Sequence, residues 1–514
     1  MKSLSSGSGF QSPGMVVIPP PSPSDTNPPL GPAVLARVAE QQGVHLSVVD
    51  LNIAYVNRFR DTARRRPSHA LGDHGKDRAL VQAAARELFS CFGLAQERPL
   101  FLPTGEQPIA GMHYAFDTLD RCLTQVASEG ALSAWLEETL FGRPDWPPRV
   151  FGVSLMGPSQ VFVGLLLLQL VKQRHPEIVT VVGGSHVTLL GQSMHTDARY
   201  RRHIDVVLPG HCEDAFVRLL RNPDETPGRV GRHPSTTARP HGKTVLPSEP
   251  AFAYTPLFTS AQLALYPQDR LTLPVQFTRG CVYGRCTFCT YPQVEPETTD
   301  LYENPAVDAL AELTETHGIR RFSLKDSLLT SVMMERLARA LLARRQAVEW
   351  SATTKVTRRL THSAALLAES GLRTVELGVE TVSPRGQLLI DKRARLADIE
   401  AVVTALTGQG IVVVVNLIFG LPGETLEEAD HQLHWLKDMQ RATGGRIDFS
   451  LNMLQIVRGS PLAARPGAAP LLGIAPWAYS YAWERPDWVT QFADRIADLE
   501  LADPVRPEKP SDAG

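Results

Sequence analysis

The chain has 514 residues, of which 43% are hydrophobic and 21% are charged, and its formal net charge is −2. This length predicts two or three domains with ample hydrophobic core, and the balanced charge gives no electrostatic case for nucleic acid or an anionic membrane as a partner. The longest apolar run, residues 161–171, is too short to cross a bilayer. Residues 1–14 are rich in Ser and Gly and lack the apolar core of a signal peptide, so we expect a disordered tail and a cytoplasmic protein with reduced cysteines.

Short β-like runs and helical patterns alternate over residues 15–222. Residues 58–147 interrupt this alternation and are expected to form an insertion with helical stretches. Five apolar strands separated by helices predict an α/β fold with a doubly wound, Rossmann-like parallel sheet that is buried on both faces. The expected strands are residues 15–19, 45–52, 150–156, 180–184 and 204–210, and the clearest helices are residues 33–42 and 161–174.

The alternation restarts with a new spacing after a linker at residues 223–270. Six β/α units over residues 271–465 predict a partial (β/α)6 barrel of TIM type, in which chemistry is expected at the carboxyl ends of the strands. Residues 466–514 form a C-terminal extension without an assignable pattern. The expected strands are residues 273–278, 319–325, 348–354, 374–380, 411–420 and 447–455.

Three of the six cysteines, Cys281, Cys286 and Cys289, lie within nine positions after the first barrel strand, and the other three are scattered. No further cysteine or histidine follows before His317, so the three thiolates indicate a metal centre with an open coordination position. A [4Fe-4S] cluster usually takes four cysteines, and with three of them one iron is free to bind another ligand. A zinc knuckle, which would need a fourth ligand, and inert buried thiols are the alternatives.

The segment Arg279-Gly280-Cys281, continuing to Cys286-Thr287-Phe288-Cys289, resembles the cluster loop of the radical S-adenosylmethionine (SAM) superfamily. The resemblance implies that the cysteines hold a [4Fe-4S] cluster, and that its reduction cleaves SAM to a 5′-deoxyadenosyl radical that abstracts hydrogen from the substrate. It also implies that the backbone of Phe288 lies near the adenine. The first gap has four residues where the superfamily usually has three, and we expect Gly284 to supply the backbone freedom for the extra residue.

Three further strand ends resemble SAM-contacting segments of this superfamily. The resemblance implies that Asp326 binds the SAM amino group and that Glu380, in Gly378-Val-Glu-Thr, makes polar contacts to SAM. It likewise implies SAM contacts in the segment that ends Gly-Leu-Pro-Gly-Glu-Thr. Taken singly, an acid at a strand end is more often a helix cap or a solvated charge. Lys355 and Arg358 are expected to be solvated surface charges, with SAM or substrate contact as the alternative. The residues predicted in the last segment are Asn416, Gly420 and Glu424.

The N-terminal sheet carries a second resemblance, to the cobalamin-binding fold. It rests on the segment Gly152-Val-Ser-Leu-Met and on the later Gly-Gly pair, and it implies contacts to the nucleotide tail of cobalamin. Ligands of such sheets bind at the carboxyl edge of the strands. Asn52 stands where classical members place a cobalt-ligating histidine, so the cobalt is expected to lack that ligand; a strand-end turn at Asp50 and Asn52 is the alternative. Gly210-His-Cys-Glu resembles a Gly-Glu-Gly-Glu turn of the same proteins, with Cys212 expected to be structural. The predicted cobalamin residues are Asn52, Ser154, Leu155, Gly183 and Gly184.

Together these features resemble cobalamin-binding-domain radical SAM enzymes. The resemblance implies a methyltransferase of the class B type that uses the cluster, SAM and cobalamin to methylate an unactivated carbon of a peptide or small natural product. It also implies an electron donor such as flavodoxin or ferredoxin. Three alternatives stay open: a cobalamin-assisted cyclisation or rearrangement without methyl transfer, a radical SAM enzyme that has lost cobalamin, and a metal-binding module without catalysis.

Overall fold

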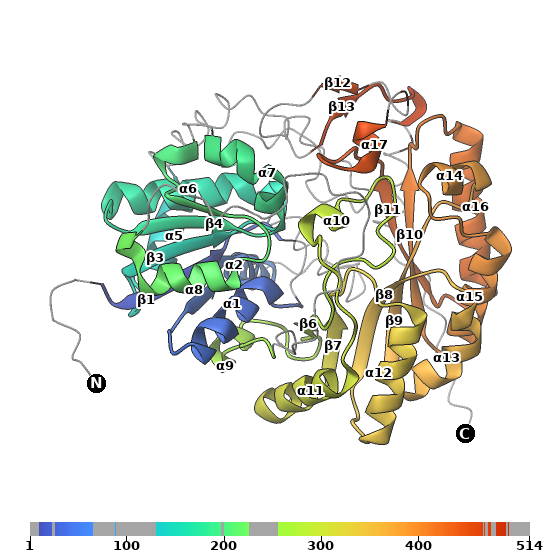
Figure 1. The fold of residues 1–514 in the computed structure, drawn as a ribbon, viewed down its shortest axis with the longest axis horizontal. Coiled ribbons are helices and arrows are strands. Elements are labelled where there is room, and N and C mark those ends of the chain that lie inside the picture. Colours follow the sequence, from blue (N-terminus) through green and yellow to red (C-terminus); the bar gives the residue numbers. More distant parts are fainter. Residues whose placement is uncertain are drawn as a thin grey trace.

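Two parallel sheets, one in each half of the chain, make up the fold, and they lie side by side in the computed structural model (Figure 1). The structure describes residues 10–22, 26–64, 88, 130–196, 200–225, 255–465, 467, 471–473, 480–489 and 492. Most of the predicted insertion at 58–147 and part of the predicted linker at 223–270 therefore lie outside the described residues.

The N-terminal sheet has five parallel strands in the order β2-β1-β3-β4-β5, as the alternation predicted. The order reverses between β1 and β3, which makes their carboxyl ends the ligand-binding edge of such a sheet. Its strands are β1 (Ser12–Ile18), β2 (Ser47–Asp50), β3 (Pro148–Ser154), β4 (Val179–Gly183) and β5 (Val206–Leu208). Its helices are α1 (Leu30–Gln41), α2 (Leu51–Arg64), α5 (Ala131–Phe141), α6 (Val161–Arg174), α7 (Ser185–Thr196) and α8 (Glu213–Arg221), with short 3-10 turns at Pro158–Gln160, Tyr200–Arg202 and Pro223–Glu225.

Helices cover both faces of this sheet. An apolar cluster on one face joins the strands to α1 and α8, and a larger cluster on the other face joins them to α2, α5, α6 and α7. The strands are therefore buried on both sides, which is why they read as nearly continuous apolar runs. Helix α6 has the predicted bounds, and ten of its 14 residues are buried.

Several element boundaries in this half differ from the prediction, and two of the differences have a clear physical reason. Strand β1 begins at Ser12, inside the predicted tail 1–14, because Ser12 pairs with Pro148 on β3 and its hydroxyl donates to the carbonyl oxygen of Asp145. The strand predicted at 45–52 ends at Asp50, whose Oδ1 accepts the backbone N–H of Ile53 and so caps the start of α2. Both departures depend on contacts outside the local sequence pattern. Pro148 is distant from Ser12 along the chain, and Ile53 follows the predicted strand.

The C-terminal half forms an open six-stranded parallel sheet in the order β11-β10-β9-β8-β7-β6, which confirms the predicted partial barrel. The strands are β6 (Leu273–Val275), β7 (Arg321–Leu324), β8 (Glu349–Lys355), β9 (Leu372–Glu380), β10 (Val412–Phe419) and β11 (Ile447–Met453). The helices are α9 (Ser260–Leu263), α10 (Tyr291–Val294), α11 (Glu303–His317), α12 (Ser331–Ala343), α13 (Arg359–Glu369), α14 (Pro384–Leu389), α15 (Leu396–Gly408), α16 (Leu426–Ala442) and α17 (Pro461–Ala464). A small antiparallel pair follows, β12 (Leu471–Gly473) and β13 (Ala482–Trp483).

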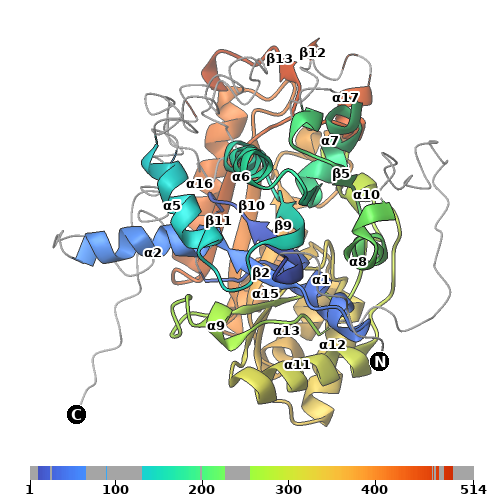
Figure 2. The ribbon, with the colours of Figure 1, turned by 90° about the vertical axis from the view of Figure 1, so that its left-hand side faces the viewer.

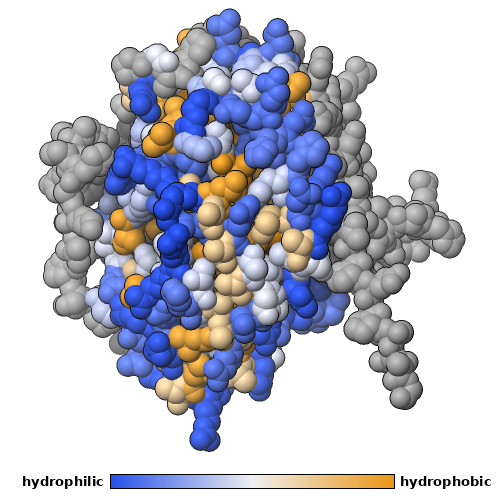
Figure 3. All heavy atoms as spheres, turned by 90° about the vertical axis from the view of Figure 1, so that its right-hand side faces the viewer, coloured by the Kyte–Doolittle hydropathy of each residue, from blue (hydrophilic) through white to orange (hydrophobic). Residues whose placement is uncertain are grey.

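The two faces of the barrel sheet differ in polarity. On β10, Val413, Val415 and Leu417 are fully buried in the core shared with the outer helices, whereas Val414 and Asn416 are partly exposed. Since side chains alternate along a strand, the second face lines the inside of the barrel. That inner face is largely polar, with Ser323, Ser351, Thr353, Glu376, Ser450 and Asn452. On the outside, the helical surface that faces right in Figure 1 mixes hydrophilic and hydrophobic residues (Figure 3).

The two halves pack directly against each other, and in Figure 2 the N-terminal half lies in front of the barrel. Ala33 and Ile53, from α1 and α2, belong to the barrel core. The Tyr266 hydroxyl donates to the buried carboxylate of Asp50, and burial raises the pKa of Asp50. Helix α7, at the carboxyl edge of the first sheet, contacts α10, which follows the third cysteine. The carboxyl ends of both sheets therefore meet in one region. None of the helices among the described residues is long and apolar enough to span a membrane.

Candidate functional site

The three-cysteine loop follows β6 and requires two glycines in left-handed conformation. Gly280 has φ +66, and a Cβ there would lie 2.2 Å from the carbonyl oxygen of Glu297. Gly284 has φ +58, and a Cβ would approach the carbonyl oxygen of Cys281 to 3.3 Å. Residues with a Cβ rarely adopt this region, so the structure confirms that Gly284 supplies the backbone freedom in the lengthened first gap.

The thiols of Cys281, Cys286 and Cys289 are free and partly exposed. The Sγ of Cys281 accepts the N–H of Gly284 and that of Cys289 accepts the N–H of Tyr291, both at 3.5 Å. Burial raises the pKa of Cys286 to about 12 and also raises that of Cys289, so a metal must displace these protons. Within the described part of the chain no three His, Cys, Asp or Glu side chains already form a metal-binding group. The donor set suits a cluster held by three thiolates once the sulfur atoms converge.

The turn after α14 holds the cysteine loop from outside. The Tyr283 hydroxyl donates to the carbonyl oxygen of Asp391, and the Arg285 guanidinium pairs with the Asp391 carboxylate at 3.0 Å. Thr287 donates its N–H to the carbonyl oxygen of Ile390 at 3.1 Å. The Lys355 ammonium lies 3.4 Å from the centre of the Tyr283 ring. Partial burial of this ammonium lowers the pKa of Lys355. The loop therefore has a defined conformation outside its thiols.

Asp326 lies where a cationic ligand could meet the start of the same loop. Its Oδ1 accepts the N–H groups of Phe277 at 3.0 Å and of Thr278 at 2.5 Å, and the Thr278 hydroxyl at 2.7 Å. Its Oδ2 is buried and has no hydrogen-bond partner among the described residues. Burial raises the pKa of Asp326 to about 6. Since an unpaired buried carboxylate oxygen is costly, this atom fits the role of accepting an ammonium group, such as the SAM amino group.

Glu380 forms a buried ion pair that the sequence did not predict. The Lys392 ammonium donates to Glu380 Oε1 and to the carbonyl oxygen of Gly378, both at 2.7 Å. A Cβ at Gly378 would lie 2.3 Å from the Lys392 Nζ, so a side chain there would displace the ammonium from this pair. Glu380 itself has φ +67, a conformation that costs about 1–3 kcal/mol and clusters at functional sites. Lys392 also lies close enough to Cys286 to favour its thiolate form.

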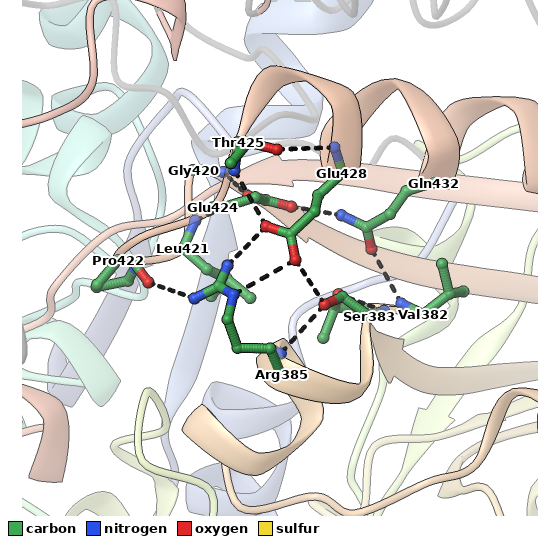
Figure 4. A network of polar contacts seen from close by, with 12 residues as sticks. Val382, Ser383, Arg385, Gly420, Leu421, Pro422, Glu424, Thr425, Glu428 and Gln432 are labelled. Atoms are coloured by element: carbon green, nitrogen blue, oxygen red, sulfur yellow. Dashed lines mark hydrogen bonds and ion pairs between the residues drawn. The ribbon is translucent and has the colours of Figure 1, made fainter.

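Glu424, which is predicted to contact SAM, has partners within the protein for both of its carboxylate oxygens (Figure 4). Its Oε2 accepts the N–H groups of Gly420 at 2.6 Å and Leu421 at 2.9 Å, and its Oε1 accepts the Gln432 amide at 2.7 Å. Burial raises the pKa of Glu424 to about 7. Gly420, which has φ +76, donates its N–H to this carboxylate. The carboxylate therefore shapes the turn, and its contact with SAM stays a prediction.

The other residues that are predicted to contact SAM, Asn416 and Phe288, lie near the Glu380–Lys392 pair. Asn416 is half-buried on β10, beside Gly378 on β9 and Ser450 on β11. Phe288 packs against an apolar cluster that contains Ile390 and Leu421. The cysteine loop, the turn after α14 and the Gly420 turn are thereby joined on one side of the barrel mouth. Arg358 is an exposed surface charge paired with Asp398, as expected.

At the N-terminal sheet, two residues that are predicted to contact cobalamin have partners within the protein. Asn52 is buried, and its Oδ1 accepts the N–H of Ser22 at 2.8 Å. The Leu155 side chain is fully buried in the core, and its backbone bonds to Gly183 and His186. Their side chains thus act within the protein. For Asn52 these contacts favour the strand-end turn that was the alternative, and contact of either residue with cobalamin stays a prediction.

Ser154 and Gly183 fit a ligand-binding edge better. They are paired neighbours at the carboxyl ends of β3 and β4, and both are partly exposed. Gly184 has φ +103, and a Cβ there would lie 2.4 Å from the carbonyl oxygen of Leu155, so backbone packing alone requires this glycine. The pair of small residues leaves backbone accessible to the tail of a large ligand, whereas Gly184 supports the turn.

A polar bridge joins this edge to the cysteine loop, and no sequence motif predicts it. Glu213, the first residue of α8, pairs with the Arg279 guanidinium at 2.5 Å, and both side chains are largely buried. Glu295 Oε2 accepts the N–H of Gly280 at 2.9 Å. His211 lies 3.8 Å from Glu213 and 4.0 Å from Glu295. The turn that resembles Gly-Glu-Gly-Glu therefore contacts the loop that carries the cysteines.

The amino-acid sequence of residues 275–436 matches the Radical SAM superfamily. The anaerobic magnesium-protoporphyrin IX monomethyl ester cyclase of Rubrivivax gelatinosus is 25% identical over 306 residues, covering 57% of this chain and 54% of that protein. The uncharacterized methyltransferase PH0819 of Pyrococcus horikoshii is 23% identical over 305 residues, covering 57% of this chain and 64% of that protein. The match thus spans about half to two thirds of these curated relatives.

Two solved structures are similar over almost the whole chain. The radical SAM methyltransferase TsrM from Kitasatospora setae, solved with cobalamin and a [4Fe-4S] cluster, has a TM-score of 0.59 at 18% identity and covers 96% of this chain and 91% of its own. The cobalamin-dependent SAM radical enzyme OxsB, solved with aqua-cobalamin, has a TM-score of 0.58 at 12% identity and covers 94% of this chain and 66% of its own. The protein therefore contains a radical SAM domain at residues 275–436 and has, as a whole, the two-domain fold of cobalamin-dependent radical SAM enzymes.

Proposed function

We propose that the protein is a radical SAM methyltransferase that uses a [4Fe-4S] cluster, SAM and cobalamin to methylate an unactivated carbon. The observation that carries the radical SAM part is Asp326: its Oδ1 fixes the backbone that leads into the cysteine loop, and its buried Oδ2 is left for a cation. A ligand that bears metal-chelating atoms and an amino group able to donate an N–H would satisfy this oxygen and the open coordination position together. SAM is such a ligand.

The residues of the site have separate roles. Cys281, Cys286 and Cys289 would hold the cluster, which supplies the electron for SAM cleavage when bound. Asp326 would orient the SAM amino group. Lys392 holds Glu380 in place and adds a positive charge beside Cys286, which favours the anionic ligand set of a cluster.

Cobalamin is proposed at the carboxyl edge of the N-terminal sheet. Ser154 and Gly183 would contact it there, and the polar bridge from Glu213 to Arg279 holds this edge against the cysteine loop. When bound, cobalamin would supply the methyl group. The likeness of the fold to TsrM, described as a methyltransferase with bound cobalamin, supports methyl transfer. A peptide or another natural product is proposed as the substrate, at the polar inner face of the barrel.

Anaerobic reconstitution with iron, sulfide and a corrinoid tests this function. We expect about four irons per chain, bound corrinoid after gel filtration, and release of 5′-deoxyadenosine on reduction with SAM present. Cys286→Ala should lose iron and SAM cleavage, whereas Cys212→Ala, which changes a thiol in the N-terminal half, should keep both. Retention of SAM cleavage by Cys286→Ala, or one zinc without iron, would refute the radical SAM assignment.

A second candidate is a cobalamin-assisted cyclisation without methyl transfer. The match to the anaerobic cyclase, over 57% of this chain, favours it. The same reconstituted protein, supplied with SAM carrying a labelled methyl group, separates the two. Label in the product supports methyl transfer, whereas an unlabelled product with the substrate's mass less two hydrogens supports cyclisation.

A further inference from the structure

Glu295, the residue that follows α10, holds three separate segments of the site with one buried carboxylate. Its Oε2 accepts the N–H of Gly280, in the cysteine loop, at 2.9 Å and the hydroxyl of Ser327, after β7, at 2.7 Å. Its Oε1 accepts the side-chain amide of Gln276, after β6, at 3.0 Å. Glu295 is only 9% exposed, so little water competes for these hydrogen bonds.

The contact with Ser327 links Glu295 to the atom that is proposed to receive the SAM amino group. Ser327 directly follows Asp326, whose Oδ1 accepts two backbone N–H groups from within residues 276–280. Glu295 holds the two ends of this segment, and Asp326 holds its middle. A displacement of Glu295 would therefore move the cysteine loop and the Asp326 carboxylate together.

A chain of hydrogen bonds leads from the predicted cobalamin edge to the turn that faces Glu295. The Thr188 hydroxyl donates to the carbonyl oxygen of Gly184 at 3.1 Å and accepts the N–H of Gly210 at 2.9 Å. Gly210 begins the turn after β5, and His211 is its next residue. The turn that carries His211 is therefore tied to the Gly183-Gly184 segment, beside which cobalamin is proposed to bind.

His211 lies between the two halves, just outside hydrogen-bond range of its neighbours. Its Nε2 is 4.0 Å from Glu295 Oε1, and its Nδ1 is 3.8 Å from Glu213 Oε1, whereas N–H···O bonds measure about 2.7–3.2 Å. A shift of about 1 Å in the turn would bring His211 within hydrogen-bond range of Glu295. Glu213 meanwhile keeps the turn against the cysteine loop through its ion pair with Arg279.

We propose that Glu295 is a positioning residue that couples the two cofactor sites, and that His211 contacts it when a corrinoid occupies the N-terminal edge. This inference rests on the proposed function. A corrinoid at the edge would order the turn after β5 and close the contact between His211 and Glu295. The cysteine loop and the Asp326 carboxylate would then already be fixed, so SAM would bind at a smaller entropic cost and more tightly.

Two binding measurements on the anaerobically reconstituted, unreduced protein test this coupling. Equilibrium dialysis gives the Kd of radiolabelled SAM with and without saturating hydroxocobalamin, and the Kd of hydroxocobalamin with and without SAM. Without a reductant SAM is not cleaved, so the readout is affinity and not activity. We expect each Kd to fall about five- to tenfold when the other ligand is present, and by the same factor, because coupling between two binding sites is reciprocal.

His211→Ala removes the link and keeps every hydrogen bond of Glu295. This variant should bind SAM alone within about twofold of the unsubstituted affinity, whereas its coupling factor should fall to about one. The matched control is His175→Ala, because His175 also lies beside a glutamate, Glu177, and its side chain is 30% exposed against 27% for His211. The control should keep the full coupling factor.

Glu295→Gln keeps the size of the side chain but replaces one acceptor oxygen with a donor that faces the Gln276 amide. It should weaken SAM binding about tenfold even without hydroxocobalamin and abolish the coupling. The matched control Glu335→Gln changes an equally buried carboxylate, 8% exposed, that pairs with Arg359 on the outer side of the barrel, and it should keep both properties. Iron content is measured for each protein, and His211→Ala decides the proposal if Glu295→Gln fails to bind iron.

A coupling factor of one in an unsubstituted protein that binds both ligands would overturn the inference and leave the proposed function intact. Full coupling in His211→Ala, or weaker SAM binding in the presence of hydroxocobalamin, would overturn it as well. Failure of the proposed function looks different: the unsubstituted protein would bind no iron or no hydroxocobalamin, and the inference would fall with it.

Discussion

Replacing Lys392 with methionine should destabilise the barrel domain because it leaves the Glu380 carboxylate buried without its partner. The substitution keeps an unbranched side chain of similar length and removes the ammonium. Both groups of the pair are about nine-tenths buried, at 9% and 11% exposure. At 2.7 Å, and with an effective dielectric constant of about 20, their attraction is about 6 kcal/mol.

The cost of desolvating both charges offsets part of this attraction. Removing one partner of a buried ion pair typically lowers the free energy of unfolding by about 3–5 kcal/mol, and we expect a loss of this size here. In a domain of this size each kcal/mol lowers Tm by about 2–4 °C, which gives a fall of about 6–20 °C. The fall should be largely reversed in the double variant K392M/E380Q, because no charge is then left uncompensated.

Thermal unfolding of the metal-free protein, followed by intrinsic fluorescence, measures this fall. Arg441→Met is the matched control: it also removes a cation from an ion pair, but one that is 77% and 72% exposed, where the contribution is below about 1 kcal/mol. A fall of less than about 2 °C for Lys392→Met, or a double variant no more stable than the single one, would refute the reasoning about the buried pair.

Three other substitutions give separate tests. Asp326→Asn should change the pH dependence of Tm, because burial raises the pKa of Asp326 in the folded protein to about 6 from 3.8. The unsubstituted protein should therefore lose stability relative to the variant as the pH rises from about 4 to about 6. Parallel curves of Tm against pH for the two proteins would contradict this. Gly284→Ala should lower iron incorporation, because a backbone φ of +58 costs a residue with a Cβ about 1–2 kcal/mol. The control Gly408→Ala, which has nothing within 4 Å of the new Cβ, should bind iron normally. Equal iron content in the two variants would contradict the role assigned to Gly284. Glu213→Gln should speed limited proteolysis of the cysteine loop, because the Arg279 guanidinium loses its largely buried anionic partner, and cleavage at the unsubstituted rate would contradict a bridge that holds the loop.

The architecture could be predicted from the amino-acid sequence. Apolar runs mark strands that are buried on both faces, and helical spacing marks the segments between them, so the two sheets and their parallel strands were within reach of local patterns. Helix α6 was predicted at its observed bounds because it is apolar on nearly every side. The cysteine loop could also be found from sequence, since its three thiols are close along the chain and their function depends on that spacing.

Which side chains meet at the site depends on tertiary packing and could not be predicted in this way. Glu380 and Glu424 look alike as acids after barrel strands, yet one forms an ion pair with Lys392 and the other braces its own turn. The difference comes from a left-handed φ at Glu380 and from the position of Gln432 on a neighbouring helix. The bridge from Glu213 to Arg279 joins two domains that no local pattern relates. Periodicity reports which residues are buried together, whereas the partner of a buried charge is set by how separate elements pack.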